Sequence, residues 1–304
     1  MKNKYVLISP CRNESKYMRQ TLDTVIAQSV RPTLWVIVDD GSTDETPHIL
    51  LEYAKKHAWI KVVTRKDRGK RSVGPGVIEA FNEGYAAINP DEFKYLCKLD
   101  LDLRMPPKYF EIIMQRMDEN PRIATASGKA YIETDHGLES ERHGDENSLG
   151  MVKFYRVDCF KEMGGFVQQV MWDGIDGHLC RMHGWMAMSW EDPELRFVHL
   201  RPMGSSQQSI FTGRMRHGFG QYFMGSSFLW MLLTFVYRVP EKPYVIGGFF
   251  IVLGWLKAWI KGEDRYQNTA FRKFLSDYQW RAMFIGKKKA IEEIHEKYAS
   301  KSIL

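Results

Sequence analysis

Short apolar runs that alternate with helical patterns constrain the fold of this chain more than any other feature. Residues 5–8 and 34–38 are continuous apolar runs, which are typical of strands buried on both faces of a parallel sheet. Residues 16–29 lie between them with apolar side chains at helical spacing, and the alternation continues with a helix at 47–56 and a strand at 59–64. Strands joined through helices require right-handed crossovers, so we predict an α/β domain with a mostly parallel sheet.

Polar side chains follow three of the predicted strands at the point where each strand ends. They are Asn13, Glu14, Asp39, Asp40, Asp100 and Asp102. Ligands of parallel sheets bind beyond the carboxyl ends of the strands, so we predict that the binding site lies at this edge. The run after the second strand also has the composition of a turn, and Ser42 or Thr43 is suited to cap the following helix.

Two carboxylates lie one residue apart after the alternating stretch 95–99. Residues i and i+2 of a strand point to the same side, so we expect Asp100 and Asp102 to project together. Two like charges this close favour a cation between them, and Mg²⁺ or Mn²⁺ prefers carboxylate oxygens together with substrate phosphates. The spacing therefore indicates a site for a divalent cation and a diphosphate. A solvated strand end is the alternative, because Asp is common in turns.

A basic loop interrupted by glycines spans residues 65–76 and precedes a helix predicted at 77–88. Basic side chains on a loop before a helix N-terminus are suited to bind a diphosphate, and Lys70 is the candidate in this loop. A mobile, solvated loop is the alternative interpretation.

Four motifs occur in order along the first hundred or so residues. They are P-x-x-N-E at 10–14, V-D-D-G-S-T-D at 38–44, A-F-N-E-G at 80–84 and D-L-D at 100–102. The set resembles the motifs of family 2 glycosyltransferases, in which the third usually has Arg where this chain has Phe81. The resemblance implies the GT-A fold, which is Rossmann-like, and a nucleotide-sugar donor. Together with Lys70 of the basic loop and Arg201, the candidate donor-binding residues are Pro10, Arg12, Asn13, Glu14, Asp39, Asp40, Asp100, Leu101 and Asp102.

The resemblance also implies a catalytic residue. Residues 164–166 resemble the family's G-G-F, which precedes an acidic pair and a helix that ends in R-x-x-G-W, here 181–185. The family's spacing to that glycine gives Asp173 the role of catalytic base, with Trp172 in place of the usual Glu. An inverting transfer needs such a carboxylate to take the proton from the acceptor hydroxyl. Asp176 is the second candidate for the base, and a helix N-cap is the alternative interpretation of Asp173.

Residues 195–206 resemble the last sheet strand of the family and the segment that follows it. A histidine there often completes the metal–diphosphate site, which makes His199 a candidate metal ligand together with Asp100 and Asp102. A hydrogen-bonded core residue is the alternative interpretation of His199. Arg201 is a candidate for binding the leaving diphosphate, because a guanidinium can pair with it through two hydrogen bonds.

The composition limits the partners and the compartment. A formal net charge of +6 over 304 residues suits an anionic partner: a nucleotide, a nucleic acid or an acidic membrane surface. The four cysteines lie far apart without a C-x-x-C pair, so we expect reduced core thiols instead of disulfides or zinc ligands. The apolar run near the N-terminus is too short for a signal peptide, and we expect a cytoplasmic protein.

The C-terminal third differs from the rest and predicts a second domain, 211–304, after a catalytic domain at 1–210. Its apolar runs at 228–237 and 244–260 are shorter than the ~20 residues of a spanning helix. With basic and aromatic residues at their edges, they predict a helical hairpin in one leaflet of a membrane. A buried helical pair in a soluble domain is the alternative.

Taken together, these patterns predict a metal-dependent, inverting glycosyltransferase on the cytoplasmic face of a membrane. Its expected partners are a nucleotide-sugar donor and a glycan acceptor linked to a polyprenyl diphosphate, with no nucleic acid. Arg214, Arg216 or His217 would meet the acceptor's diphosphate. Two alternatives stay open: a different nucleotide-sugar enzyme such as a nucleotidyltransferase, and a non-catalytic, membrane-bound protein that binds nucleotide sugars.

Overall fold

The computed structural model describes residues 4–69, 72–141, 143–201, 210–240 and 244–298. The chain forms two compact units. The first contains the chain up to Gln168 and the segment that begins at Trp185, and the second contains Gln169–Gly184 and the C-terminal helices. The domains expected from the sequence, 1–210 and 211–304, remain a prediction.

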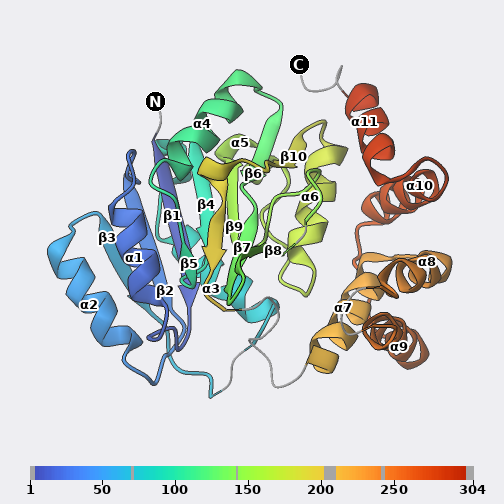
Figure 1. The fold of residues 1–304 in the computed structure, drawn as a ribbon, viewed down its shortest axis with the longest axis horizontal. Helices are drawn as coiled ribbons and strands as arrows, with labels where there is room; N and C mark the ends of the chain where they lie inside the picture. The colour runs from blue at the N-terminus through green and yellow to red at the C-terminus, as the bar shows by residue number, and fades with distance from the viewer. Residues whose placement is uncertain (1–3, 70–71, 142, 202–209, 241–243, 299–304) are drawn as a thin grey trace. The chain divides into compact units, whose positions relative to one another are not determined.

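The first unit is built on a seven-stranded sheet (Figure 1). Its strands, in spatial order, are β10 (Met186–Ser189), β6 (Ile123–Ser127), β9 (Val152–Arg156), β4 (Tyr95–Leu99), β1 (Tyr5–Cys11), β2 (Leu34–Asp39) and β3 (Ile60–Thr64). Neighbouring strands are parallel except where β9 pairs with β4 and β6. This is the mostly parallel α/β sheet that the sequence predicts.

Strand β1 is longer than its apolar run. The apolar run covers residues 5–8 only, but β1 continues to Cys11, with Pro10 beside Val38 and Cys11 beside Asp39. The pairing of β1 with β4 ends at Ile8, so Pro10 lies where the strand has β2 alone as a neighbour. A residue without an N–H is tolerated at such a position, because fewer sheet hydrogen bonds are required there.

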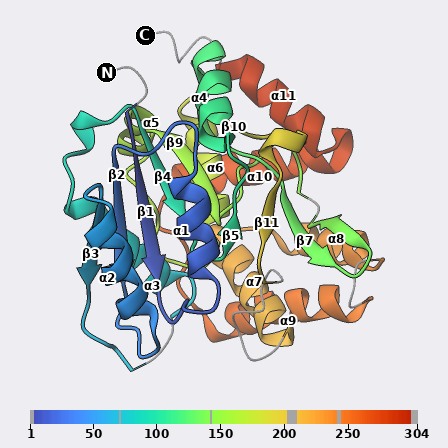
Figure 2. The same ribbon diagram turned by 60° about the vertical axis from the view of Figure 1, so that its left-hand side comes forward.

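The two faces of this sheet carry separate apolar cores. The helices of the unit are α1 (Met18–Ile26), α2 (Thr46–Lys56), α3 (Pro75–Ala86), α4 (Tyr109–Glu119) and α5 (Val157–Glu162), with short 3₁₀ turns at Pro90–Glu92 and Pro193–Leu195. On β2, Trp35 and Ile37 share the larger core with side chains of α1 and α4. Helix α3 lies on the opposite face of the sheet from α1 (Figure 2). Val36 and Val38 pack there with Ala80 of α3. Alternate residues of a strand point to opposite faces, which explains the division.

A second sheet of four short strands belongs to the same unit. Its order is β5 (Leu103–Arg104), β11 (Phe197–His199), β7 (Ala130–Thr134) and β8 (Gly137–Ser140). The polar segment 134–150 predicts a loop, and this is wrong for 137–140, which pair with β7 as an antiparallel hairpin. Residues 137–140 are exposed on both sides, including Leu138, so they lack the alternation of buried and exposed residues that marks a half-buried strand.

Phe81, which stands where the resembled family usually has Arg, is a core residue. It is fully buried on α3, and its ring centroid lies 4.8 Å from that of Phe166 and 5.8 Å from that of Phe160. Tyr85 and Tyr155 belong to the same aromatic group. A guanidinium here would be buried among aromatic rings without a hydrogen-bond partner, at a high cost in free energy.

The second unit is helical. Its helices are α6 (Trp172–Met182), α7 (Ile210–Met224), α8 (Phe228–Arg238), α9 (Ile246–Lys261), α10 (Thr269–Ile285) and α11 (Lys287–Tyr298). Both apolar runs of the C-terminal third therefore form helices, α8 and α9. Over the ranges that the structure describes, no helix is long and apolar enough to cross a membrane.

Helices α7 and α9 approach each other closely at two glycines. A Cβ atom on Gly218 would lie 1.9 Å from the carbonyl oxygen of Ile251. A Cβ atom on Gly254 would lie 2.1 Å from the carbonyl oxygen of Met215. Backbone atoms cannot move aside as a flexible side chain can, so this helix pair depends on both glycines.

The contact of α3 with the main sheet gives a stability prediction. A Cβ atom on Gly84 would lie 2.7 Å from Cγ2 of Ile8 and 2.9 Å from Cγ2 of Val38, both buried. Overpacking of this kind costs about 1–3 kcal/mol and exceeds the roughly 0.5–1 kcal/mol by which Ala favours a helix. We expect Gly84→Ala to lower the midpoint of urea unfolding.

Asn82→Ala, on the exposed side of the same helix, is the matched control. Its effect on the free energy of unfolding is expected to stay within about 0.5 kcal/mol. A Gly84→Ala variant as stable as this control would contradict the close contact.

Candidate functional site

The loops that follow β1 and β2 are joined by hydrogen bonds. Asn13 N–H donates to Ser42 Oγ (2.9 Å), and Thr43 N–H donates to Asn13 Oδ1 (2.8 Å). Glu14 N–H donates to Thr46 Oγ1 (2.8 Å). Asn13 has a φ of 55°, in the left-handed region that Asn tolerates better than most residues. The first two motifs of the sequence therefore form one structure.

Ser42 and Thr43 do not cap the following helix. Helix α2 begins at Thr46, whose N–H donates to Asp44 Oδ1 (3.0 Å), and the Ser15 N–H donates to the other oxygen of Asp44 (3.2 Å). The capping prediction is wrong because the Ser42 hydroxyl binds Asn13 instead.

The adjacent carboxylates Asp39 and Asp40 have different surroundings. Asp39 is buried, and its Oδ1 accepts a hydrogen bond from the Ser42 N–H (2.9 Å), which shapes the loop. Asp40 Oδ1 lies 2.6 Å from Arg65 Nη1, and its Oδ2 pairs with Arg68. The arginines of the basic loop therefore bind a carboxylate of the protein, which compensates its buried charge.

Arg12 joins the same group. Its guanidinium donates to the carbonyl oxygen of Asp40 and lies 2.6 Å from Asp67 Oδ1. The structure brings Arg12, Asn13, Asp39 and Asp40 together at the carboxyl ends of β1 and β2, and their roles toward a donor remain predictions. Lys70 lies outside the described residues.

The D-x-D motif lies directly after β4 and is held by its backbone. The Asp100 N–H donates to the carbonyl oxygen of Met151, and the carbonyl oxygen of Asp102 accepts from the Leu200 N–H, both at 2.8 Å. Leu101 is buried in the larger core, so its side chain anchors the motif. The two carboxylates of the motif have different partners. Asp100 Oδ1 lies 2.5 Å from the buried Lys98 Nζ, whereas Asp102 pairs with Arg201.

Asp102 is the buried centre of a group of charges. Its Oδ2 lies 2.5 Å from Arg201 Nε and 3.5 Å from His199 Nε2. Arg201 also pairs with Glu14 Oε1 at 2.9 Å, so it connects the first motif of the sequence to the last. This pairing cannot be predicted from local sequence patterns, because Glu14 and Arg201 lie near opposite ends of the part of the chain that forms the first unit.

The charges in this group change the pKa values. Burial would raise the pKa of Asp102, but the hydrogen bond from His199 and the charge of Arg201 outweigh it and hold that pKa below its ordinary value. Burial would lower the pKa of His199, but Asp102 and Glu141 raise it to about 9. With these partners His199 is an imidazolium at neutral pH, and it must lose the Nε2 proton to act as a metal ligand.

The surroundings of Asp102 fit a divalent cation. Its Oδ1 is buried and has no hydrogen-bond partner among the described residues, although a carboxylate oxygen needs one when it is removed from water. No three His, Cys, Asp or Glu side chains in the described ranges come close enough to hold an ion by themselves. Mg²⁺ in nucleotide sites is commonly bound by one or two carboxylates and completed by substrate phosphates, so the absence of a three-residue group does not conflict with the predicted site at Asp100 and Asp102.

The predicted base, Asp173, belongs to the second unit. It lies in the first turn of α6, half-buried, after the buried Trp172. The N-cap of α6 is Met171, so the alternative interpretation of Asp173 as the cap is wrong. Asp173 lies near Arg216 of α7: burial lowers the pKa of that guanidinium, and the charge of Asp173 offsets only part of this effect. Asp176 is buried, and its Oδ1 accepts a hydrogen bond from the Gly177 N–H.

A model of the protein family described as Glycosyl transferase family 2 matches residues 6–186. The chain belongs to this family. The matched range covers the motifs from Pro10 to Asp102 and includes Asp173, whereas His199 and Arg201 lie beyond it.

Curated relatives of this family 2 protein match part of it. The poly-beta-1,6-N-acetyl-D-glucosamine synthase of Staphylococcus epidermidis is 28% identical over 122 residues. The match covers 40% of this chain and 27% of that synthase, so the matched part of the chain spans about a quarter of the relative's length. An uncharacterized glycosyltransferase of Haemophilus influenzae is 28% identical over 121 residues, which are 40% of this chain and 34% of that protein.

Solved structures resemble this family 2 protein over its whole length. A mannosyltransferase from Pyrobaculum calidifontis, in complex with GDP-Man and Mn²⁺, has a TM-score of 0.54 at 15% identity, covering 99% of this chain and 87% of that one. S. aureus TarS 1-349, in complex with UDP-GlcNAc, has a TM-score of 0.53 at 16% identity, covering 99% and 88%. The likeness shows the fold, a GT-A-like sheet domain followed by helices, as predicted.

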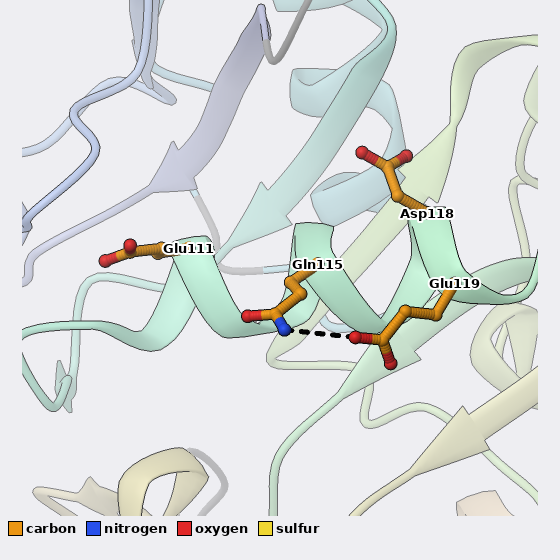
Figure 3. A pocket seen from close by; sticks show the side chains of 4 residues that line it. All are labelled: Glu111, Gln115, Asp118 and Glu119. Carbon is orange, nitrogen blue, oxygen red and sulfur yellow. Dashed lines mark hydrogen bonds between the residues drawn. The ribbon is translucent and has the colours of Figure 1, made fainter.

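A hollow on α4 lies away from these residues (Figure 3). It is lined by Glu111, Gln115, Asp118 and Glu119, and Gln115 Nε2 donates to Glu119 Oε1 (3.0 Å). Asp118 pairs with Tyr95 at the amino end of β4, the opposite end from Asp100. The hollow is therefore at the wrong end of the sheet for the ligand of a parallel α/β domain.

Proposed function

We propose that this protein transfers a sugar, with inversion, from a nucleotide-diphosphate sugar to a hydroxyl of a glycan acceptor. One observation carries the proposal: in a chain of family 2, the D-x-D motif ends a central strand and buries Asp102 between His199 and Arg201. The buried Oδ1 of Asp102 has no hydrogen-bond partner among the described residues and suits a cation, and the cationic Arg201 beside Asp102 suits a diphosphate.

The donor would lie along the carboxyl ends of β1, β2 and β4. In the proposal, Asp39 and Asp40 contact the base and ribose, and the loop formed by Pro10, Arg12, Asn13 and Glu14 fixes their positions. The hydrogen bonds between Asn13 and the loop of Ser42 support this, because they give the pocket a fixed geometry before the donor arrives. Lys70 of the basic loop would add positive charge near the diphosphate.

Asp102, with Asp100 and a neutral His199, would hold a Mg²⁺ or Mn²⁺ ion. When bound, such an ion neutralises negative charge that develops on the leaving diphosphate. Arg201 would release Asp102 and donate to the diphosphate, so that the carboxylate and the guanidinium exchange partners. The mannosyltransferase structure named above, with GDP-Man and Mn²⁺, supports this choice of cation.

Asp173 would take the proton of the attacking acceptor hydroxyl. General bases of this kind contribute about 10²–10⁴-fold to the rate. Its half-buried position in the first turn of α6, after the buried Trp172, suits a carboxylate that is partly shielded from water. Asp176 is less suitable, because it is buried and bonded to its own helix.

The acceptor would be lipid-linked, and the second unit would bind the membrane surface. Large apolar side chains are exposed along α8 and α9: Phe228, Leu229, Leu232, Leu233, Val236, Ile246, Phe249, Leu253, Trp259 and Ile260. Surfaces of this kind mark contact with a membrane or a protein. We favour the membrane because Arg238 ends α8, Lys261 ends α9 and three lysines begin α11, which suits anionic headgroups.

A polyprenyl-diphosphate glycan is the acceptor that this surface suits. Its tail would lie along α8 and α9, and Arg214, Arg216 or His217 of α7 would meet its diphosphate. The enzyme would act at the cytoplasmic face in the synthesis of a cell-surface polysaccharide, as a monotopic or peripheral protein with domains at 1–210 and 211–304. The four buried thiols are compatible with a reducing compartment.

Replacing Asp102 tests the cation site. We expect Asp102→Ala to lower the transfer rate at least about 100-fold, since charge stabilisation of the leaving group is commonly the largest catalytic contribution. A panel of UDP-, GDP- and dTDP-sugars with Mn²⁺ should raise the melting temperature of the wild type and not of the variant. Asp135→Ala, on the exposed β7–β8 turn, is the control. Full activity of the wild type in EDTA would contradict this site.

Replacing Asp173 separates catalysis from donor binding. Asp173→Asn keeps the shape of the side chain and removes the base, so we expect kcat to fall about 10²-fold or more while donor affinity is retained. Steady-state kinetics and donor titration measure the two effects. An equal loss of both, or a loss of kcat in Asp176→Asn alone, would show that Asp173 is not the base.

Introducing negative charges on α8 tests the proposed membrane-binding surface. Leu229 and Leu233 are one turn apart and both exposed, so Leu229→Glu with Leu233→Glu should weaken binding to vesicles of phosphatidylcholine and phosphatidylglycerol by at least about tenfold in flotation. Leu51→Glu, at an exposed leucine of α2, is the matched control. Wild-type protein that does not float with these vesicles would refute the membrane proposal and leave the transfer reaction unaffected.

A further inference from the structure

A second buried carboxylate lies behind His199. Glu141 Oε2 is 3.0 Å from His199 Nδ1, while Nε2 of the same ring is 3.5 Å from Asp102 Oδ2. The side chains of all three residues are less than a tenth exposed. The imidazole is therefore held between two carboxylates, one on each ring nitrogen.

Strand pairing places His199 between the D-x-D motif and Glu141. His199 pairs with Leu103 of β5, next to the D-x-D motif, and its strand β11 is parallel to β7 (Figure 2). Glu141 follows β8 directly, and its N–H donates to the carbonyl oxygen of Ala130 in β7 (3.0 Å). The β7–β8 hairpin thus brings Glu141 to the strand that carries His199.

Strand β8 contributes little to the core. Residues 137–140 are all exposed, whereas the side chain of the next residue, Glu141, is buried. Burying a carboxylate costs free energy unless it is paired. The contact with the His199 ring is a reason to keep a buried Glu at the end of the exposed strand β8.

Imidazole chemistry explains what the contact does. The ring can turn over about its bond to Cβ, which exchanges nitrogen and carbon positions, and either nitrogen can carry the proton. An acceptor at Nδ1 selects the orientation in which Nδ1–H donates to it and Nε2 faces the other way. Carboxylates that hold a metal-binding histidine in this manner raise metal affinity about 10–100-fold.

We propose that Glu141 is a positioning residue: it fixes the His199 ring so that Nε2 faces Asp102 and the divalent cation. The inference rests on the proposed function, because it deepens the account of the same cation site. Glu141 itself contacts neither donor nor cation in this proposal, and it acts through His199.

Mn²⁺ binding to the full chain, measured from the EPR signal of free Mn²⁺, tests this role without turnover. We expect Glu141→Ala to weaken binding about 10–100-fold. Glu139→Ala is the matched control, because Glu139 lies on the same hairpin, exposed, and accepts from Thr134 Oγ1 (3.1 Å). Glu141→Gln keeps an acceptor oxygen and should recover part of the lost affinity. Wild-type affinity in Glu141→Ala, or no recovery in Glu141→Gln, would overturn the proposal.

The ¹⁵N shifts of the His199 ring, in protein labelled at histidine and without metal, give a second readout. Glu141→Ala should change the Nδ1 shift, and Glu139→Ala should not. Unchanged shifts in Glu141→Ala would overturn the positioning role. If the wild type and Asp102→Ala bind Mn²⁺ equally, the proposed cation site fails, and the ring shifts still decide whether Glu141 positions His199.

Discussion

The parallel register of β1 with β2 and β4 is the constraint on which the first unit depends. It places Cys11 beside Asp39, so the loops after these strands leave the sheet at one level and exchange hydrogen bonds. Strand β4 lies on the other side of β1 and delivers Asp100 and Asp102 to the same edge. A slip of one residue would turn every side chain of a strand to the opposite face, and the polar edge would be lost.

The features that could be predicted from the sequence are those that depend on residues close together in the chain. The apolar runs of β1 and β2, the polar residues at their ends and the spacing of the D-x-D motif lie within short windows, and each has a direct physical meaning. The family motifs added the GT-A fold, which the structural comparisons support. The helices α8 and α9 could also be predicted, because a long apolar run indicates a helix whether the helix is buried or exposed.

The features that were missed depend on partners far apart in the chain. No local pattern links Glu141 to His199, or Arg65 and Arg68 to Asp40, so these ion pairs emerge only when the sheets assemble. Strand β6 is made of small and polar residues after Ile123 and carries almost no periodic signal. Phe81 departs from the resembled motif, and its reason is tertiary: the aromatic group on the far side of the sheet.

The antiparallel strand β9 affects how the chain folds during synthesis. Strands β1 to β4 emerge from the ribosome first, and they leave β4 as an open edge whose partner, Val152–Arg156, is made much later. At about 5–20 residues per second this edge stays unpaired for several seconds. Its residues, Tyr95–Leu99, are buried in the finished sheet and apolar except for Lys98, so the nascent chain exposes an aggregation-prone strand. Translation speed between β4 and β9 therefore sets how long this strand edge stays exposed.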